Sequence, residues 1–140
     1  MEVQVCKTKE DILKCRDAVL ELRPHIPKDD FVAMVSNMIE EGYQLAFIEK
    51  DGKAAAAVGY RYLQFLYNGK HIYIDDLSTL PSYSGKGYAG KLLDFVEAEA
   101  KTKGYKAVTL DSGHHRTNAH RLYLNKGFAI VAHHFSKTLK

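Results

Sequence analysis

Apolar side chains recur every three or four positions in two early stretches of the chain, which is the spacing of an amphipathic helix. The first stretch begins after Thr8, a potential N-cap, and stops before Pro24. The second stretch follows the acidic pair Asp29 and Asp30 and is closed by Gly42. The side chains expected to face inward are Ile12, Cys15, Val19 and Leu22 in the first helix, and Phe31, Met34, Val35, Met38 and Ile39 in the second.

The middle of the chain changes to aromatic and β-branched residues, in runs over residues 43–50, 53–66 and 70–80. The dipeptides Asp51-Gly52 and Asn68-Gly69 separate these runs. Both dipeptides favour the positive φ angles of tight hairpin turns. The pattern therefore predicts an antiparallel meander.

Helical spacing returns after Pro81, where apolar residues at positions 89, 92, 93, 96 and 100 predict an amphipathic helix that runs to Gly104. A strand over residues 106–111, a short helix over about residues 117–126 and a final strand over residues 128–139 complete the pattern. The predicted order is β-α-α-β-β-β-α-β-α-β. This order predicts one α/β domain over residues 1–140, with a mixed, mostly antiparallel sheet flanked by helices.

The composition of this 140-residue chain, with 46% hydrophobic and 26% charged residues, is that of an ordinary folded domain. The net charge of +3 comes from scattered lysines and arginines, which suits an anionic ligand but argues against a nucleic-acid partner. No apolar run reaches the ~18 residues of a membrane span, and no secretory segment is present. Cys6 and Cys15 resemble core residues rather than a disulfide framework. We therefore expect a cytoplasmic protein without a membrane partner.

The loop SGKGYAGKLL, residues 84–93, fits more than one phosphate-binding pattern. A nucleoside-triphosphate loop needs a hydroxyl after Gly-Lys to ligate Mg²⁺, and this chain has Leu92 at that position. The dinucleotide pattern Gly-x-Gly-x-x-Gly is present, and Asp111 lies near the position of a ribose-binding acid. However, residues 81–84 separate the glycines from the preceding strand, and the further βαβ units of that fold are lacking. Both interpretations are therefore disfavoured.

The small residues of this loop nevertheless indicate a phosphate ligand. Gly85, Gly87 and Ala89 remove side chains that would block a pyrophosphate, and the following helix presents its N-terminus there. Lys86 and Lys91 add positive charge. A glycine-rich loop that merely enters a helix would leave these features unexplained.

Two segments resemble the GNAT superfamily of acyl-CoA N-acyltransferases. LSTLPSYSGKGYAGKLL, residues 77–93, resembles motif A, whose pattern Gln/Arg-x-x-Gly-x-Gly/Ala falls on Ser84, Gly87 and Ala89. AHRLYLNKGF, residues 119–128, resembles motif B. Ser84 departs from the Gln or Arg of the family, which weakens the match without abolishing it, because backbone N–H groups supply most of the grip. The resemblance is firm over residues 72–128 and only topological before them.

The resemblance implies a single N-acetyltransferase domain over residues 1–140 that uses acetyl-CoA as co-substrate and no metal. In this fold the strand before the loop splays from the strand after the central helix, and pantetheine lies in the gap. The backbone of Leu77, Ser78 and Thr79 would then bind pantetheine and polarise the acyl carbonyl, and Arg116 would position CoA or cap its helix. The residues that would hold the pyrophosphate are Gly85, Lys86, Gly87, Tyr88, Ala89 and Gly90.

Tyr123 occupies the tyrosine position of motif B, so the resemblance implies that it donates a proton to the departing thiolate. The candidates for the base are Asp75, Asp76 and Asp111, with His114 or His115 as alternatives. Two acids in mid-strand are unfavourable unless their charge is used. Since adjacent strand residues face opposite ways, only one of the pair at 75 and 76 is expected to enter the pocket. No histidine has the spacing of a zinc site.

The sequence thus predicts an N-acetyltransferase that moves acetyl to the primary amine of a small molecule by direct attack in a ternary complex. Four acids near the ends of the second helix would suit a polyamine or an aminoglycoside, although solvated helix ends explain them equally well; they are Asp29, Asp30, Glu40 and Glu41. A protein N-terminus or lysine as acceptor, and a non-catalytic acyl-CoA-binding module, are the alternatives. A homodimer is a further open expectation.

Overall fold

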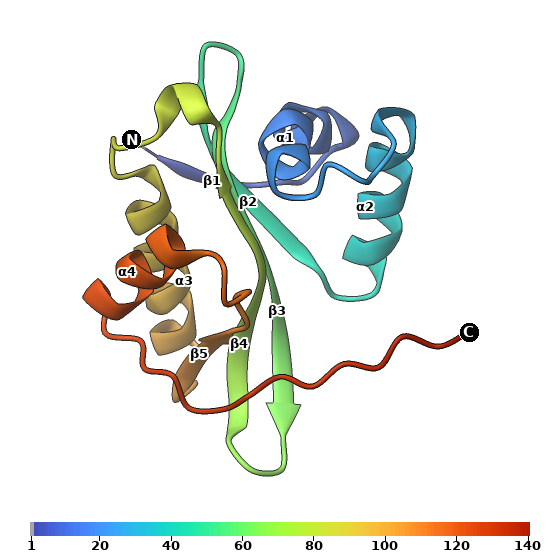
Figure 1. Ribbon diagram of the computed structural model, residues 1–140. Coiled ribbons are helices and arrows are strands. Elements are labelled where there is room, and N and C mark those ends of the chain that lie inside the picture. Colours follow the sequence, from blue (N-terminus) through green and yellow to red (C-terminus); the bar gives the residue numbers. More distant parts are fainter. Residues whose placement is uncertain (1) are drawn as a thin grey trace. The chain divides into compact units, whose positions relative to one another are not determined.

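The computed structural model describes residues 2–140, which divide into two compact units, one ending at Leu110 and one formed by Asp111–Lys140 (Figure 1). The second unit contains α4 (Thr117–Asn125). The elements of the first unit are β1 (Val3–Val5), α1 (Lys9–Leu22), the 3₁₀ turn η1 (Lys28–Asp30), α2 (Phe31–Glu40), β2 (Gln44–Lys50), β3 (Lys53–Phe65), β4 (Gly69–Thr79), the 3₁₀ turn η2 (Pro81–Tyr83), α3 (Tyr88–Thr102) and β5 (Ala107–Leu110). The α/β fold class is confirmed, and one domain over residues 1–140 stays a prediction.

The strands form one mixed sheet in the order β1-β2-β3-β4-β5, antiparallel except for the parallel pair of β4 and β5. The meander predicted from the sequence is therefore confirmed. Asp51 and Gly52 have the predicted positive φ angles, 55° and 83°. At the second turn only Gly69 does, at 72°, because the connection is longer than a two-residue turn and leaves Phe65 paired with Gly69.

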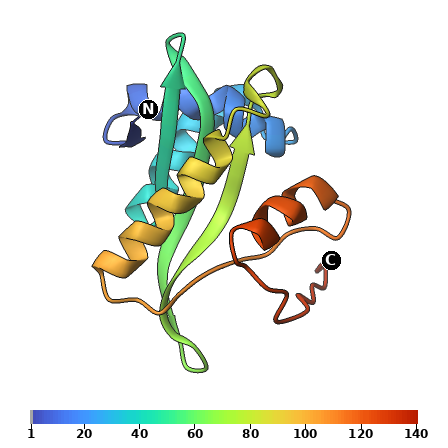
Figure 2. The ribbon, with the colours of Figure 1, turned by 90° about the vertical axis from the view of Figure 1, so that its left-hand side faces the viewer.

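Helices cover both faces of this sheet, with α1 and α2 on one face and α3 on the other (Figures 1 and 2). Thr8 caps α1 as predicted: its hydroxyl accepts the backbone N–H of Asp11 at 3.1 Å, and the Asp11 carboxylate completes the capping box. Alternation in β2 sends Leu45 and Phe47 into the core under α1 and α2. The second helix follows the acidic pair as predicted: Asp29 and Asp30 lie in η1, and α2 begins directly after them at Phe31.

The final strand expected over residues 128–139 is not formed. Its large apolar side chains are exposed, with Ile130 at 81% and Phe135 at 89% of their full accessibility. A strand requires a second backbone to complete its hydrogen bonds, and no strand of residues 2–140 pairs with this segment. None of the helices described is both long and apolar enough to cross a membrane.

Candidate active site

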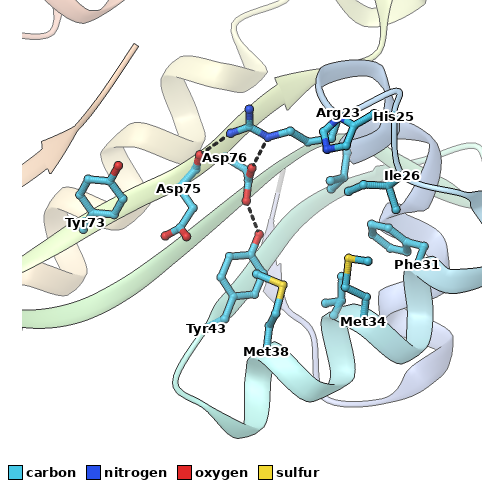
Figure 3. A pocket seen from close by; sticks show the side chains of 12 residues that line it. Arg23, His25, Ile26, Phe31, Met34, Met38, Tyr43, Tyr73, Asp75 and Asp76 are labelled. Atoms are coloured by element: carbon cyan, nitrogen blue, oxygen red, sulfur yellow. Dashed lines mark hydrogen bonds and ion pairs between the residues drawn. The ribbon is translucent and has the colours of Figure 1, made fainter. Parts of the chain in front are cut away.

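A bulge in β4 brings two carboxyl groups to one cavity. The register of β3 against β4 passes from Tyr60 opposite Ile74 to Gly59 opposite Asp76, so Asp75 has no partner residue. Asp75 and Asp76 both line a cavity of about 410 Å³ (Figure 3). The expectation that only one of them enters the pocket is therefore wrong, because it assumed unbroken alternation along the strand.

Asp76 is held at both of its carboxylate oxygens. Arg23 donates from Nε to Oδ1 at 2.9 Å, and the Tyr43 hydroxyl donates to Oδ2 at 2.7 Å (Figure 3). Arg23 also donates from Nη2 to the backbone carbonyl of Asp75 at 3.0 Å. Asp76 therefore ties the end of α1 and the start of β2 to the bulge.

Tyr43 reaches Asp76 by crossing Gly59. A Cβ atom at Gly59 would lie 1.7 Å from the Tyr43 hydroxyl oxygen and 2.3 Å from its Cζ, so only glycine leaves room for the ring. Burial, and then the charge of Asp76, raises the pKa of Tyr43 well above its ordinary value, so the phenol stays protonated and donates. Sequence reasoning missed this contact, although a lone glycine inside a strand run was the available signal.

Asp75 is held at one oxygen only. Arg61 donates from Nε to Oδ2 at 2.9 Å, whereas Oδ1 is buried and has no hydrogen-bond partner among residues 2–140. Burial raises the pKa of Asp75 above its usual range, and the hydrogen bond and charge of Arg61 oppose that shift. A carboxylate with a raised pKa and an unused acceptor oxygen beside a cavity is suited to taking a proton from a ligand.

Most of the rest of the cavity wall is apolar and comes from α1, α2 and the segment between them, while Tyr73 on β4 and Tyr43 before β2 add two phenols. Figure 3 shows Phe31, Met34 and Met38 gathered on the α2 side, away from the two carboxyl groups. None of the four helix-end acids considered from the sequence lines the cavity; these are Asp29, Asp30, Glu40 and Glu41.

The edge of β4 beyond the bulge is free of strand pairing on its β5 side. β5 pairs with β4 only from His71 opposite Ala107 to Ile74 opposite Leu110, and within the part of the chain described no strand continues along this edge to Thr79. Leu77, Ser78 and Thr79 lie on this stretch. The pairing stops where β5 itself ends, at Leu110, so the splayed gap that the family resemblance implied for a pantetheine chain stays a prediction.

The loop between β4 and α3 has the geometry of an anion site. Gly85 and Gly87 have φ angles of 76° and 83°, in the left-handed region, and no atom lies within 4 Å of where either Cβ would be. The first helical hydrogen bond of α3 runs from the Lys91 N–H to the Gly87 carbonyl at 3.1 Å, so the N–H groups of residues 88–90 precede it. The Ser84 hydroxyl donates back to the Pro81 carbonyl at 2.9 Å. Backbone groups, rather than the Ser84 side chain, therefore fit a pyrophosphate here.

Tyr123 and Arg116 belong to the second unit. The Tyr123 ring lies edge-on to Phe128, with 5.9 Å between the ring centroids. Burial raises the pKa of Tyr123, and the charge of Arg116 opposes the shift. The phenol therefore holds its proton at neutral pH, as a proton donor must.

Asp111 and the histidine candidates also lie in the second unit. An Asp111 carboxylate oxygen is 3.6 Å from Nδ1 of His134, and the rings of His114 and His115 pack edge to face with centroids 5.7 Å apart. Among residues 2–140, no three His, Cys, Asp or Glu side chains are grouped so as to hold a metal ion.

Comparison with known proteins agrees with motifs A and B. A sequence model of the acetyltransferase (GNAT) family matches residues 10–128. The chain is 30% identical to the uncharacterized N-acetyltransferase YhdJ of Bacillus subtilis (strain 168), over 93% of each protein. It is 24% identical to the aminoalkylphosphonate N-acetyltransferase of Salmonella typhimurium (strain LT2), over 96% of this chain and 92% of that protein.

Solved structures show the same fold. The aminoglycoside N-acetyltransferase AAC(6')-Iy in complex with CoA matches with a TM-score of 0.85 at 16% identity, over 99% of this chain and 94% of that chain. The resemblance inferred from the two motifs is confirmed: the chain belongs to the acetyltransferase (GNAT) family and is an acyltransferase.

Proposed function

We propose that this protein transfers the acetyl group of acetyl-CoA to the primary amine of a small molecule, by direct attack within a ternary complex. One observation carries the proposal: the bulge in β4 sets Asp75 into a cavity, and the unpaired edge suited to pantetheine begins on the same strand. The donor and the acceptor would thus meet at one strand. The cavity volume of about 410 Å³ is in the range of small-molecule sites.

Acetyl-CoA would supply an acetyl group activated as a thioester. The backbone of Leu77, Ser78 and Thr79 would hold pantetheine like an added strand, and the loop of residues 85–90 would hold the pyrophosphate. The side chains of Lys86 and Lys91 would add positive charge near the phosphates. Arg116 is assigned to CoA positioning by its place in the sequence alone.

Asp75 would act as the base. An amine enters as its ammonium form, and the Asp75 carboxylate takes one proton from it. The neutral nitrogen then forms the C–N bond as the C–S bond of the thioester breaks, and its second proton leaves to solvent. The Tyr123 phenol would give its proton to the departing thiolate, completing the free thiol, and would regain a proton from water.

Asp75 is preferred to Asp76 because both oxygens of Asp76 are already engaged by Arg23 and Tyr43. Asp76 is instead a positioning residue, which fixes the bulge. Asp111, His114 and His115 remain alternative bases that the sequence suggested.

The names of two relatives favour a small acceptor, because one acts on aminoalkylphosphonates and the other on aminoglycosides. The test is incubation with acetyl-CoA and a panel of amines, following thiol release and identifying the acetyl amide by mass spectrometry. Amine-dependent thiol release with matching amide is expected. Binding of acetyl-CoA without release with any amine would favour a non-catalytic module, and acetylation of peptide N-termini or lysines alone would favour a protein acceptor.

A further inference from the structure

The candidate acceptor cavity has two walls of opposite chemistry. Asp75 and Asp76 stand on the β4 side with Arg23, whereas the α2 side carries Phe31, Met34 and Met38 (Figure 3). Met34 lines the cavity and is 40% exposed, so a ligand can reach this residue. Methionine is flexible and polarisable, which lets such a wall adapt to apolar groups of different shape.

Each of the two acids that line this cavity already forms an ion pair with an arginine. Asp76 pairs with Arg23 and Asp75 pairs with Arg61, each with 2.9 Å between nitrogen and oxygen. The lining contains no other aspartate or glutamate. Asp75 Oδ1, which is buried and has no hydrogen-bond partner among residues 2–140, is the one carboxylate oxygen of the lining left for an ammonium group, and a second ammonium group would find no carboxylate.

A second positive charge on the acceptor would thus lose its water beside an arginine or a methionine, with no carboxylate to pair it. Such desolvation is strongly unfavourable. An apolar body would instead displace water from the α2 wall, which is favourable. These two effects act in the same direction. They disfavour the polyamines and aminoglycosides that the helix-end acids suggested, since those acids lie outside the cavity lining.

Building on the proposed function, we propose that the acceptor is a primary monoamine carried on an apolar body, such as an alkyl or arylalkyl amine. Its ammonium group meets Asp75, and its body lies on the wall formed by Phe31, Met34 and Met38. The apolar wall and the ion pairs of the two acids with arginines together favour this class of amines.

The test is acetyl-CoA turnover with the n-alkylamines from ethylamine to hexylamine, with phenethylamine, and with spermidine, kanamycin and taurine. We expect kcat/KM to rise along the alkyl series by about fourfold for each methylene group that becomes buried. The kcat/KM for phenethylamine should exceed those for spermidine and kanamycin at least about tenfold, since spermidine and kanamycin each carry charges that the cavity cannot pair.

A variant and a matched control locate the effect. Met34→Gln keeps an unbranched helix-forming side chain, and it should reduce the dependence of kcat/KM on alkyl chain length. Leu13→Gln makes a similar change at a 50% exposed position on α1 that does not line the cavity, and it should leave that dependence intact.

The outcomes separate this inference from the proposed function. A higher kcat/KM for spermidine, kanamycin or the anionic amine taurine than for the alkylamines and phenethylamine would overturn the inference of an apolar monoamine acceptor. It would leave amine acetylation in place. A flat alkyl series, or equal effects of Met34→Gln and Leu13→Gln, would overturn it as well. Absence of amine-dependent thiol release across the whole panel would overturn both.

Discussion

Gly59→Ala adds one methyl group, which should break the hydrogen bond between Tyr43 and Asp76 that helps to hold the bulge in β4. The new Cβ would lie 1.7 Å from the Tyr43 hydroxyl oxygen, whereas ordinary contacts begin at 3.4 Å. Tyr43 is only 2% exposed and is packed in the core on one side while it lines the candidate cavity on the other, so the ring can make room for the methyl group only by leaving its present position. It must withdraw, and its 2.7 Å hydrogen bond to Asp76 is then lost.

The cost follows from these contacts. A hydrogen bond to a charged group contributes about 1.5–3 kcal/mol, and forcing a methyl group into a packed core costs about 1–3 kcal/mol. Alanine in a strand gains about 0.5–1 kcal/mol over glycine, which offsets part of the loss. We therefore expect Gly59→Ala to lower the free energy of unfolding by about 2–5 kcal/mol.

Urea unfolding of Gly59→Ala, Tyr43→Leu and the double variant measures the coupling. Leucine lacks the outer ring atoms that meet the new methyl group, so in the Tyr43→Leu background Gly59→Ala should cost less than about 1 kcal/mol. Equal cost of Gly59→Ala in both backgrounds would refute the crossing of Tyr43 over Gly59.

Three further predictions concern the donor site. Acetyl-CoA should raise the melting temperature while NAD and ATP-Mg do not, and stabilisation by NAD alone would restore the dinucleotide interpretation. Gly87→Asp should raise the KM for acetyl-CoA about tenfold or more, because it places a carboxylate against the pyrophosphate. Gly104→Asp, at another left-handed glycine with φ of 73°, should leave this KM unchanged. Equal KM values for the two variants would place the phosphates elsewhere. Tyr123→Phe should lower kcat roughly ten- to a thousand-fold with little change in acetyl-CoA affinity, and normal turnover would remove Tyr123 from the chemistry.

Local signals predicted most of the elements. The Thr8 cap, the helical spacing and the Asp51-Gly52 turn each act within a few residues, and the structure has them where the sequence indicated. The strand predicted over residues 128–139 was wrong, because a strand depends on a partner that the segment itself does not contain.

The details of the site depend on distant pairings that a single sequence does not display. The bulge at Asp75 follows from how β3 and β4 are aligned, and the room for Tyr43 comes from Gly59 on a neighbouring strand. The partners of the two acids, Arg23 and Arg61, lie far from them in sequence or across the sheet. Sequence reasoning therefore found the acids but not which of them has an unused oxygen.

The dependence of kcat/KM on pH for Asp75→Asn tests the central claim most directly. If Asp75 takes the proton of the acceptor, its loss should lower kcat/KM at neutral pH by roughly a hundred- to ten-thousand-fold, and the deficit should shrink as rising pH deprotonates the amine in solution. Wild-type activity should fall on the acid side at a higher pH than an ordinary aspartate would give, because burial raises the pKa of Asp75.

Asp76→Asn is the matched control, since it changes the neighbouring carboxyl group that positions the bulge. Its loss of activity should persist at high pH. The account predicts recovery at high pH for Asp75→Asn alone. Wild-type kcat/KM for Asp75→Asn at neutral pH, or recovery in Asp76→Asn instead, would contradict it.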